Sequence, residues 1–337
     1  MHTRYVLIML TATLPLLPAA AHHSTAFYSS EFIELEGTFA RIDWINPHVR
    51  FVLRTMEPNG AEKLWTMEAS ATSALQRRGV SRELFRVGDR VKVAGHPSTR
   101  SDAELQLTNV LLPDGREASL WLDSAQRFAN SGGAMIRNAD VVVDAARENR
   151  GLFRVWTAPR PNPLTGEVIS LNQPFTAAAV EARKSFDLLD NFATRCEPTG
   201  MPAVMAGPLP YQFIDRGAQI EIKAEIYDTI RTIHMDRVSP PPDVPASPLG
   251  YSVGQWQDGA LVVATTRVNW PYYDTIGTPQ SDAVEITERF ALSEDQTRLD
   301  FRITVRDPAT LTAPAVIAGH WLALGHEVQR FACQRSR

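Results

Sequence analysis

The sequence predicts an all-β protein of two barrels: an OB-like five-stranded barrel, then a larger antiparallel lipocalin-like barrel, with a mixed connector between them. Two patterns carry this prediction. Five short segments that alternate apolar and polar residues surround one helical stretch in residues 32–112, and about nine such segments fill residues 211–333. The predicted boundaries are residues 22–116 for the first barrel, 117–195 for the connector and 196–337 for the second barrel.

A signal peptide is predicted over residues 1–21. Arg4 gives it a basic start, residues 5–17 are its apolar segment, and residues 19–21 are three alanines that suit a cleavage site. An apolar segment of about 13 residues is shorter than the roughly 20 that a membrane-spanning helix needs. We therefore expect a periplasmic or secreted protein whose mature chain has no transmembrane segment.

The elements of the first barrel follow from period-two alternation and from turn residues. Asn46-Pro47 and Pro113-Asp114-Gly115 are turn signals, and Gly79 closes a short helix predicted over residues 70–78. The predicted strands are residues 33–42, 49–54, 64–69, 90–94 and 104–112.

The connector and the second barrel are predicted in the same way. The connector has a strand candidate at residues 151–157 and a helix at residues 177–189 capped by Thr176, and Asp258-Gly259 is a tight hairpin turn. Long loops at residues 239–248 and 269–282 are the two insertions. The predicted strands are residues 211–214, 218–226, 229–236, 251–257, 260–268, 283–292, 298–305, 314–324 and 326–333.

The charge of the chain argues against a nucleic-acid partner. The formal net charge is −4 and the chain has no run of Lys or Arg, whereas nucleic-acid binding needs a basic surface.

The two cysteines, Cys196 and Cys333, are an even pair and most simply form one disulfide in an oxidising compartment. This bridge would tie the last predicted strand to the start of the second barrel. The alternative, a reactive thiol site, has neither a CxxC partner nor a nearby His.

Several spaced motifs in residues 21–116 resemble a bacterial family of secreted proteins that is numbered 6152 among domains of unknown function. These motifs include Ala21-His22-His23-Ser24, Leu35-Glu36-Gly37-Thr38, Trp44-Ile45-Asn46-Pro47-His48 and Leu112-Pro113-Asp114-Gly115-Arg116. The resemblance implies the export and the architecture of the first barrel, and it brings no established activity.

The second half resembles a lipocalin-like barrel that often accompanies this family. The motifs are Gly254-Gln255-Trp256, Leu261-Val262-Val263 and Thr287-Glu288-Arg289-Phe290. The pattern often has His where this chain has Tyr251, Gln280 and Glu285. The resemblance therefore implies that any function of those histidines is lost in this chain.

Three histidines form a candidate metal site: His22, His23 and His48. Signal-peptide cleavage would place His22 and His23 at or beside a free amine. An amine, backbone nitrogens and imidazole suit Cu(II) in square-planar geometry, so copper is the candidate cofactor. The alternatives are an N-terminal tail without a site and a His48 that only supports the Asn46-Pro47 turn.

The interior of the second barrel is the other candidate site. Its candidate ligand-binding residues are Trp256, Trp270, Tyr272, Tyr273, Arg231 and Glu288. Plain core aromatics and an internal ion pair are the alternatives for these residues.

The sequence thus predicts an exported binding protein, for a metal ion or for a small apolar molecule. The alternative is an enzyme, a hydrolase or isomerase, acting on a small apolar substrate inside the second barrel. The chain has no GxSxG, HExxH or GxGxxG motif that would favour a particular reaction.

Overall fold

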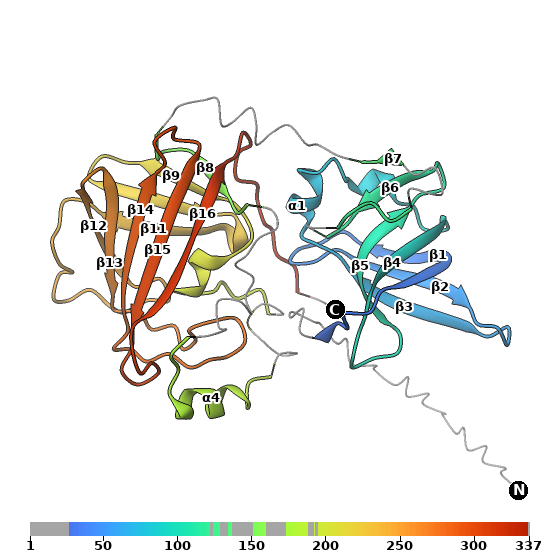
Figure 1. Cartoon of the computed structure of the whole chain (residues 1–337), viewed down its shortest axis with the longest axis horizontal. Helices are drawn as coiled ribbons and strands as arrows, with labels where there is room; N and C mark the ends of the chain where they lie inside the picture. Colours follow the sequence, from blue (N-terminus) through green and yellow to red (C-terminus); the bar gives the residue numbers. More distant parts are fainter. Residues whose placement is uncertain are drawn as a thin grey trace, which may run out of the picture.

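The computed structural model describes residues 27–121, 124–128, 134–136, 151–159, 173–187, 192 and 195–335. It confirms the all-β class, with two barrels lying side by side (Figure 1). The predicted signal peptide, His22 and His23 lie outside the described residues. Within the described part, no helix is long and apolar enough to cross a membrane.

The first barrel is a five-stranded sheet closed by a parallel pairing of β3 with β5. Its strands are β1 (Ile33–Asp43), β2 (Arg50–Met56), β3 (Glu62–Glu68), β4 (Arg90–Pro97) and β5 (Glu104–Leu111), in the order β3-β2-β1-β4-β5. Short strands β6 (Arg116–Ser119) and β7 (Ala134–Met135), which alternation does not predict, extend the sheet beyond β5.

The predicted helix between β3 and β4 is present but shorter. It is α1 (Thr72–Gln76), and Gly79 follows it at φ +81°, a conformation that glycine adopts without strain. A 3-10 turn, η2 (Arg82–Leu84), then leads to β4. The inner faces of the strands pack into one core that includes Phe39, Phe51 and Met67.

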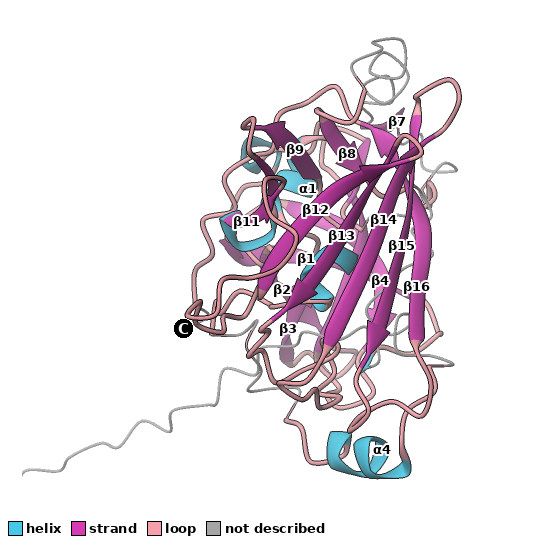
Figure 2. Cartoon of the chain, turned by 90° about the vertical axis from the view of Figure 1, so that its left-hand side faces the viewer, coloured by secondary structure: helices cyan, strands magenta, loops and turns pink. Residues whose placement is uncertain are grey.

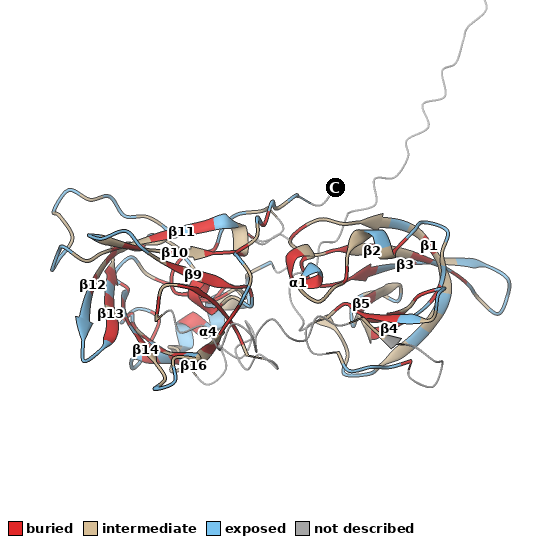
Figure 3. Cartoon of the chain, turned by 90° about the horizontal axis from the view of Figure 1, so that it is seen from above, coloured by how far each residue is buried: buried red, intermediate tan, exposed pale blue. Residues whose placement is uncertain are grey.

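The second barrel is closed by nine strands, as predicted. They are β8 (Val155–Thr157), β9 (Tyr211–Asp215), β10 (Gln219–Ala224), β11 (Thr229–His234), β12 (Tyr251–Gln257), β13 (Ala260–Thr266), β14 (Glu285–Leu292), β15 (Arg298–Arg306) and β16 (Ala315–Ala323). Figure 2 shows β12 to β16 running as neighbours along one wall. Buried residues line the inner faces of both barrels (Figure 3).

Two details of the second barrel differ from the prediction. Strands β11 and β12 pair in parallel, because the long segment between them returns the chain so that β12 begins beside the last residues of β11, with Ser252 opposite Ile233. Residues 326–333 form no barrel strand, because side-chain carboxylates rather than a neighbouring strand bind their backbone N–H groups. The ninth strand is instead β8, which the connector supplies.

Short helical elements complete the structure. Helix α4 (Ala177–Arg183) begins at Thr176, whose side chain accepts a hydrogen bond of 3.2 Å from the backbone N–H of Ala179, as the predicted cap requires. The helix ends six residues before the predicted end. The 3-10 turns η4 (Ala203–Ala206) and η5 (Ile226–Asp228) flank β9 and β10. The predicted hairpin turn is confirmed, with Asp258 at φ +48° and Gly259 at φ +75°.

Candidate functional site

His48 lies in the loop between β1 and β2, directly after the predicted Asn46-Pro47 turn. Its Nδ1 atom contacts a carboxylate oxygen of Glu68, the last residue of β3. Its ring stands edge-on to Trp121, with the ring centroids 5.8 Å apart. A carboxylate at Nδ1 holds the tautomer in which Nδ1 carries the proton, and in that tautomer Nε2 is the atom that ligates a metal.

The surroundings of His48 keep its imidazole neutral. Burial and the nearby positive charge of Arg50 lower the pKa of His48 from its usual 6.5 to about 4. Metal ions bind the neutral form of imidazole, so protons do not compete for this side chain near neutral pH.

A row of polar residues extends from His48 across the outer face of the first barrel. Arg50 on β2 is the cross-strand neighbour of Glu68 on β3, and Glu68 is in turn the neighbour of Gln106 on β5. They alternate along their strands with residues of the barrel core, so their side chains lie on the opposite face. Glu104 lies on the same face, two residues before Gln106. Sequence analysis predicted His48 but missed this row of residues, because its only sign in the sequence is polar side chains within strands.

The first described residues of the chain are fixed beside this row. Tyr28 forms a β-bridge with Ser98, and the backbone N–H of Ser29 donates to the carbonyl of Pro97 over 2.9 Å. Burial and the nearby carboxylate of Glu104 raise the pKa of the Tyr28 phenol, and Arg50 acts against this rise. Tyr28 is therefore a neighbour of the row that leads to His48.

Histidines 22 and 23, the other predicted metal ligands, lie outside the described residues, so the structure does not place them. Within the described ranges, no three His, Cys, Asp or Glu side chains form a group suited to a metal ion. His48 and Glu68 thus provide one ligand and its support, and a metal site there needs further ligands.

In the second barrel, the structure brings the predicted residues Arg231 and Glu288 together on the inner wall. Arg231 Nη1 donates to Glu288 Oε1 over 2.9 Å, and Nη2 contacts Oε2. Arg231 also donates to Ser252 and Thr265, whose hydroxyls are 2.9 Å apart. All four side chains are buried. This is the internal ion pair that the sequence analysis gave as the alternative to ligand binding, and its polar atoms bind one another.

Of the predicted aromatic residues, three share one loop, where the rings of Trp270 and Tyr272 lie 5.8 Å apart, and the fourth, Trp256, lies elsewhere. Trp256 precedes the hairpin at one end of β13, half exposed beside Phe153, whereas Trp270 follows β13 at its other end. Tyr273 is buried and stands edge-on to Phe175 at a centroid distance of 5.2 Å.

The loop that holds Trp270 and Tyr272 is packed against the connector. Trp270 lies 5.3 Å from the ring of Phe192, and Tyr272 lies 5.1 Å from that of Phe186. A Cβ on Gly277 would meet the Phe186 ring at 2.0 Å, so only glycine fits there. Three buried polar atoms of this loop have no hydrogen-bond partner within the described part of the chain: Trp270 Nε1, Tyr273 Oη and Gln280 Oε1.

Comparison with known proteins supports the resemblance of the first barrel. Residues 12–106 match the family described as "Family of unknown function (DUF6152)". The match spans the part of the chain from the predicted signal peptide into β5, and over that part it confirms the resemblance that the motifs predicted. No curated protein matches the chain.

Proposed function

We propose that the protein is an exported binding protein whose first barrel holds a transition-metal ion, copper above others, through His48, His22 and His23. The observation that supports it best is the state of His48: a neutral imidazole held by Glu68. A carboxylate behind a ligating histidine is the usual outer support of a protein metal site.

The short chain between Tyr28 and His23 is compatible with the proposed ligand set. Five residues span at most about 17 Å when extended. Tyr28 is a neighbour of Arg50, and Arg50 is a neighbour of His48.

The proposed cleavage gives the ligand set. If the mature chain begins at Ala21, His23 is the third residue, and the amine, two amide nitrogens and an imidazole can surround Cu(II). If it begins at His22, the amine and the ring form a two-point chelate that His23 and His48 complete. Copper is favoured over zinc because these nitrogens suit square-planar coordination and because affinity generally peaks at copper.

Calorimetry with Cu(II) on correctly processed protein tests this proposal. We expect His23→Ala to weaken binding, His48→Ala to weaken it if the barrel completes the site, and one extra Ser before the mature start to weaken it by displacing the amine. His234→Ala is the matched control, because it removes an imidazole from β11 of the second barrel. Wild-type binding by both His23→Ala and the extended form would rule the site out.

A second candidate is a small, mainly apolar molecule bound at the Trp270 loop. The three buried polar atoms of that loop favour it, because buried donors and acceptors normally have partners. An enzyme would need polar groups directed at a substrate. In the Arg231–Glu288 network these groups are directed at one another, so no observation favours the enzyme.

A further inference from the structure

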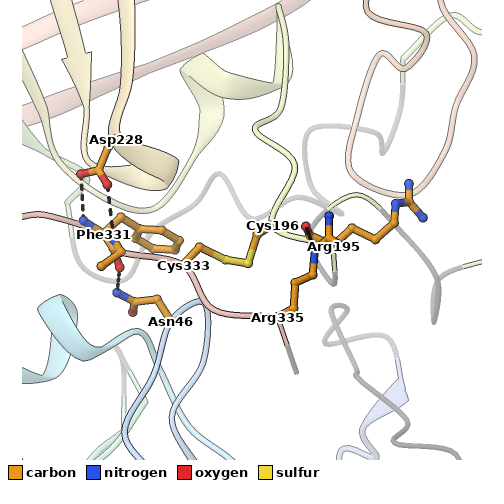
Figure 4. The surroundings of a disulfide bond; sticks show 8 residues. Asn46, Arg195, Cys196, Asp228, Phe331, Cys333 and Arg335 are labelled. Carbon is orange, nitrogen blue, oxygen red and sulfur yellow. Dashed lines mark hydrogen bonds between the residues drawn. A yellow bond between two sulfur atoms is a disulfide. The ribbon is translucent and has the colours of Figure 1, made fainter. Parts of the chain in front are cut away.

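The last described residues of the chain lie between the two barrels (Figure 1). We call residues 325–335 the C-terminal tail. Cys333 of this tail forms the predicted disulfide with Cys196, and their Cα atoms are 5.8 Å apart. Arg335 Nε also donates to the carbonyl of Arg195 over 3.0 Å, beside the disulfide (Figure 4). The tail is thus fixed covalently to the segment that precedes β9.

The second barrel holds the tail through two carboxylates. Asp228 Oδ1 accepts a hydrogen bond of 2.9 Å from the backbone N–H of Phe331, and Asp228 Oδ2 accepts one of 3.3 Å from that of Ala332 (Figure 4). Glu225 accepts a third from the N–H of Gln329 over 3.0 Å. These bonds satisfy backbone donors that would otherwise belong to a strand.

The first barrel holds the same tail through Asn46. The side-chain Nδ2 of Asn46 donates to the carbonyl of Phe331, and the carbonyl of Asn46 accepts from the N–H of Gln334 over 3.0 Å. Its Oδ1 accepts from both the N–H and the hydroxyl of Thr72, at 2.9 and 3.0 Å. Asn46 is buried, and it lies two residues before His48.

The backbone around the tail is strained. Four of the seven described non-glycine residues with positive φ are in or beside this contact: Cys196, Tyr227, Asp228 and Ala332, at φ +58°, +55°, +51° and +45°. Such conformations are unfavourable for residues with a side chain and persist where surrounding contacts enforce them. Strain of this kind clusters at sites whose geometry serves a function.

We propose that Asn46 and the C-terminal tail position His48, so that the second barrel and its disulfide set the metal affinity of the first barrel. This inference rests on the proposed function of His48 as a metal ligand. The route is short: Cys196 holds Cys333, the tail holds Asn46, and Asn46 fixes the turn that presents His48 to Glu68. Asn46 is then a positioning residue, because it acts on the metal through His48.

Two variants test this proposal on the processed full-length protein. In Cys196→Ser/Cys333→Ser the tail loses its covalent anchor without leaving a thiol that could bind copper. Asn46→Asp removes the Nδ2 donor to Phe331 and keeps the Oδ1 acceptor for Thr72. We expect each to weaken Cu(II) binding roughly tenfold or more, the usual effect of losing an outer support. Added to His48→Ala, neither should weaken binding further, because both act through His48.

Arg216→Ala, which breaks an exposed ion pair with Glu221, is the control and should bind copper like the wild type. Amide hydrogen exchange of residues 44–50 without metal gives an independent measurement, and we expect faster exchange in both test variants. Wild-type affinity in both, together with weaker binding by His48→Ala, would overturn the positioning role. If the wild type binds no copper, the proposed function fails. Amide hydrogen exchange then tests the coupling between the tail and His48 by itself. Unchanged protection of residues 44–50 in both test variants would overturn it, and lost protection would support it.

Discussion

Glu225 of the second barrel binds Arg77 of the first through two hydrogen bonds of 2.8 Å each. The side chains are only 0% and 7% exposed, so this is a buried, bidentate ion pair between the barrels. Arg77 directly follows α1, and Glu225 directly follows β10. The same carboxylate accepts from Gln329 of the C-terminal tail, so one side chain joins three parts of the chain.

Breaking this pair on one side should destabilise the protein strongly. Glu225→Ala leaves the Arg77 charge buried without its carboxylate, and we expect the free energy of unfolding to fall by about 3–5 kcal/mol. Arg77→Met/Glu225→Leu removes both charges and should recover much of that loss. Urea unfolding measures both variants. A single variant within about 1 kcal/mol of the wild type would show that the pair is worth little.

The disulfide gives the second prediction. Peptide mapping without reductant should recover Cys196 and Cys333 in one linked pair, and the mature chain should lack residues 1 to about 21. The bridge spans a sequence separation of 137 residues, so its removal should cost up to about 5 kcal/mol in the chain-entropy account. Two free thiols in the protein purified without reductant would contradict the bridge.

The Trp270→Ala variant distinguishes between two roles of the Trp270 loop, namely binding a ligand and only packing against the connector. Loss of the contact with Phe192 should lower stability by about 2–4 kcal/mol in either case. If the loop binds a ligand, the folded variant should also take up an apolar fluorescent probe more weakly. Trp256→Ala, at the opposite end of β13, is the matched control for probe binding. Unchanged affinity in folded Trp270→Ala would leave Trp270 with a packing role.

Alternation and turn residues predicted most of the fold because local sequence decides those features. Asp258-Gly259 fixes a hairpin through its own backbone preference, and Gly79 ends α1 for the same reason. Residues 326–333 show where this reasoning stops. Their apolar side chains look like a strand, but Phe331 packs against α1 and Val328 against β8. Tertiary structure decides which surface an apolar side chain packs against, and the periodicity of the sequence does not predict it.

The site was predictable only in part for a related reason. His48 was predictable as a candidate metal ligand because it is a histidine directly after a turn. Glu68, by contrast, is one of many acidic residues in strands. Only the pairing of β2 with β3 brings its carboxylate to the ring of His48. Likewise, Arg231 and Glu288 were candidates by residue type, and the barrel alone shows that they satisfy each other.

The lowered pKa of His48 predicts how stability depends on pH. The unfolded chain protonates this imidazole near 6.5, whereas burial and Arg50 hold its folded pKa at about 4. Because only the unfolded state takes up the proton between these values, stability should fall as pH drops from about 6.5 to about 4. Partial solvent exposure of the ring limits the loss to on the order of 2 kcal/mol. Urea unfolding of metal-free protein at pH 7 and pH 5 measures it.

His48→Gln should flatten this pH dependence, because it removes the group that titrates differently in the two states. His234→Gln, which alters an imidazole on β11 of the second barrel, is the matched control and should keep the wild-type slope. Above pH 6.5 the substitution removes the contacts with Glu68 and Trp121 and no difference in charge, so the two variants should differ most in acid. A His48→Gln protein with the wild-type acid slope would mean that the pKa of His48 is the same in the folded and unfolded states. The folded protein would then not hold this imidazole neutral in acid, and the main support for the proposed metal site would be lost.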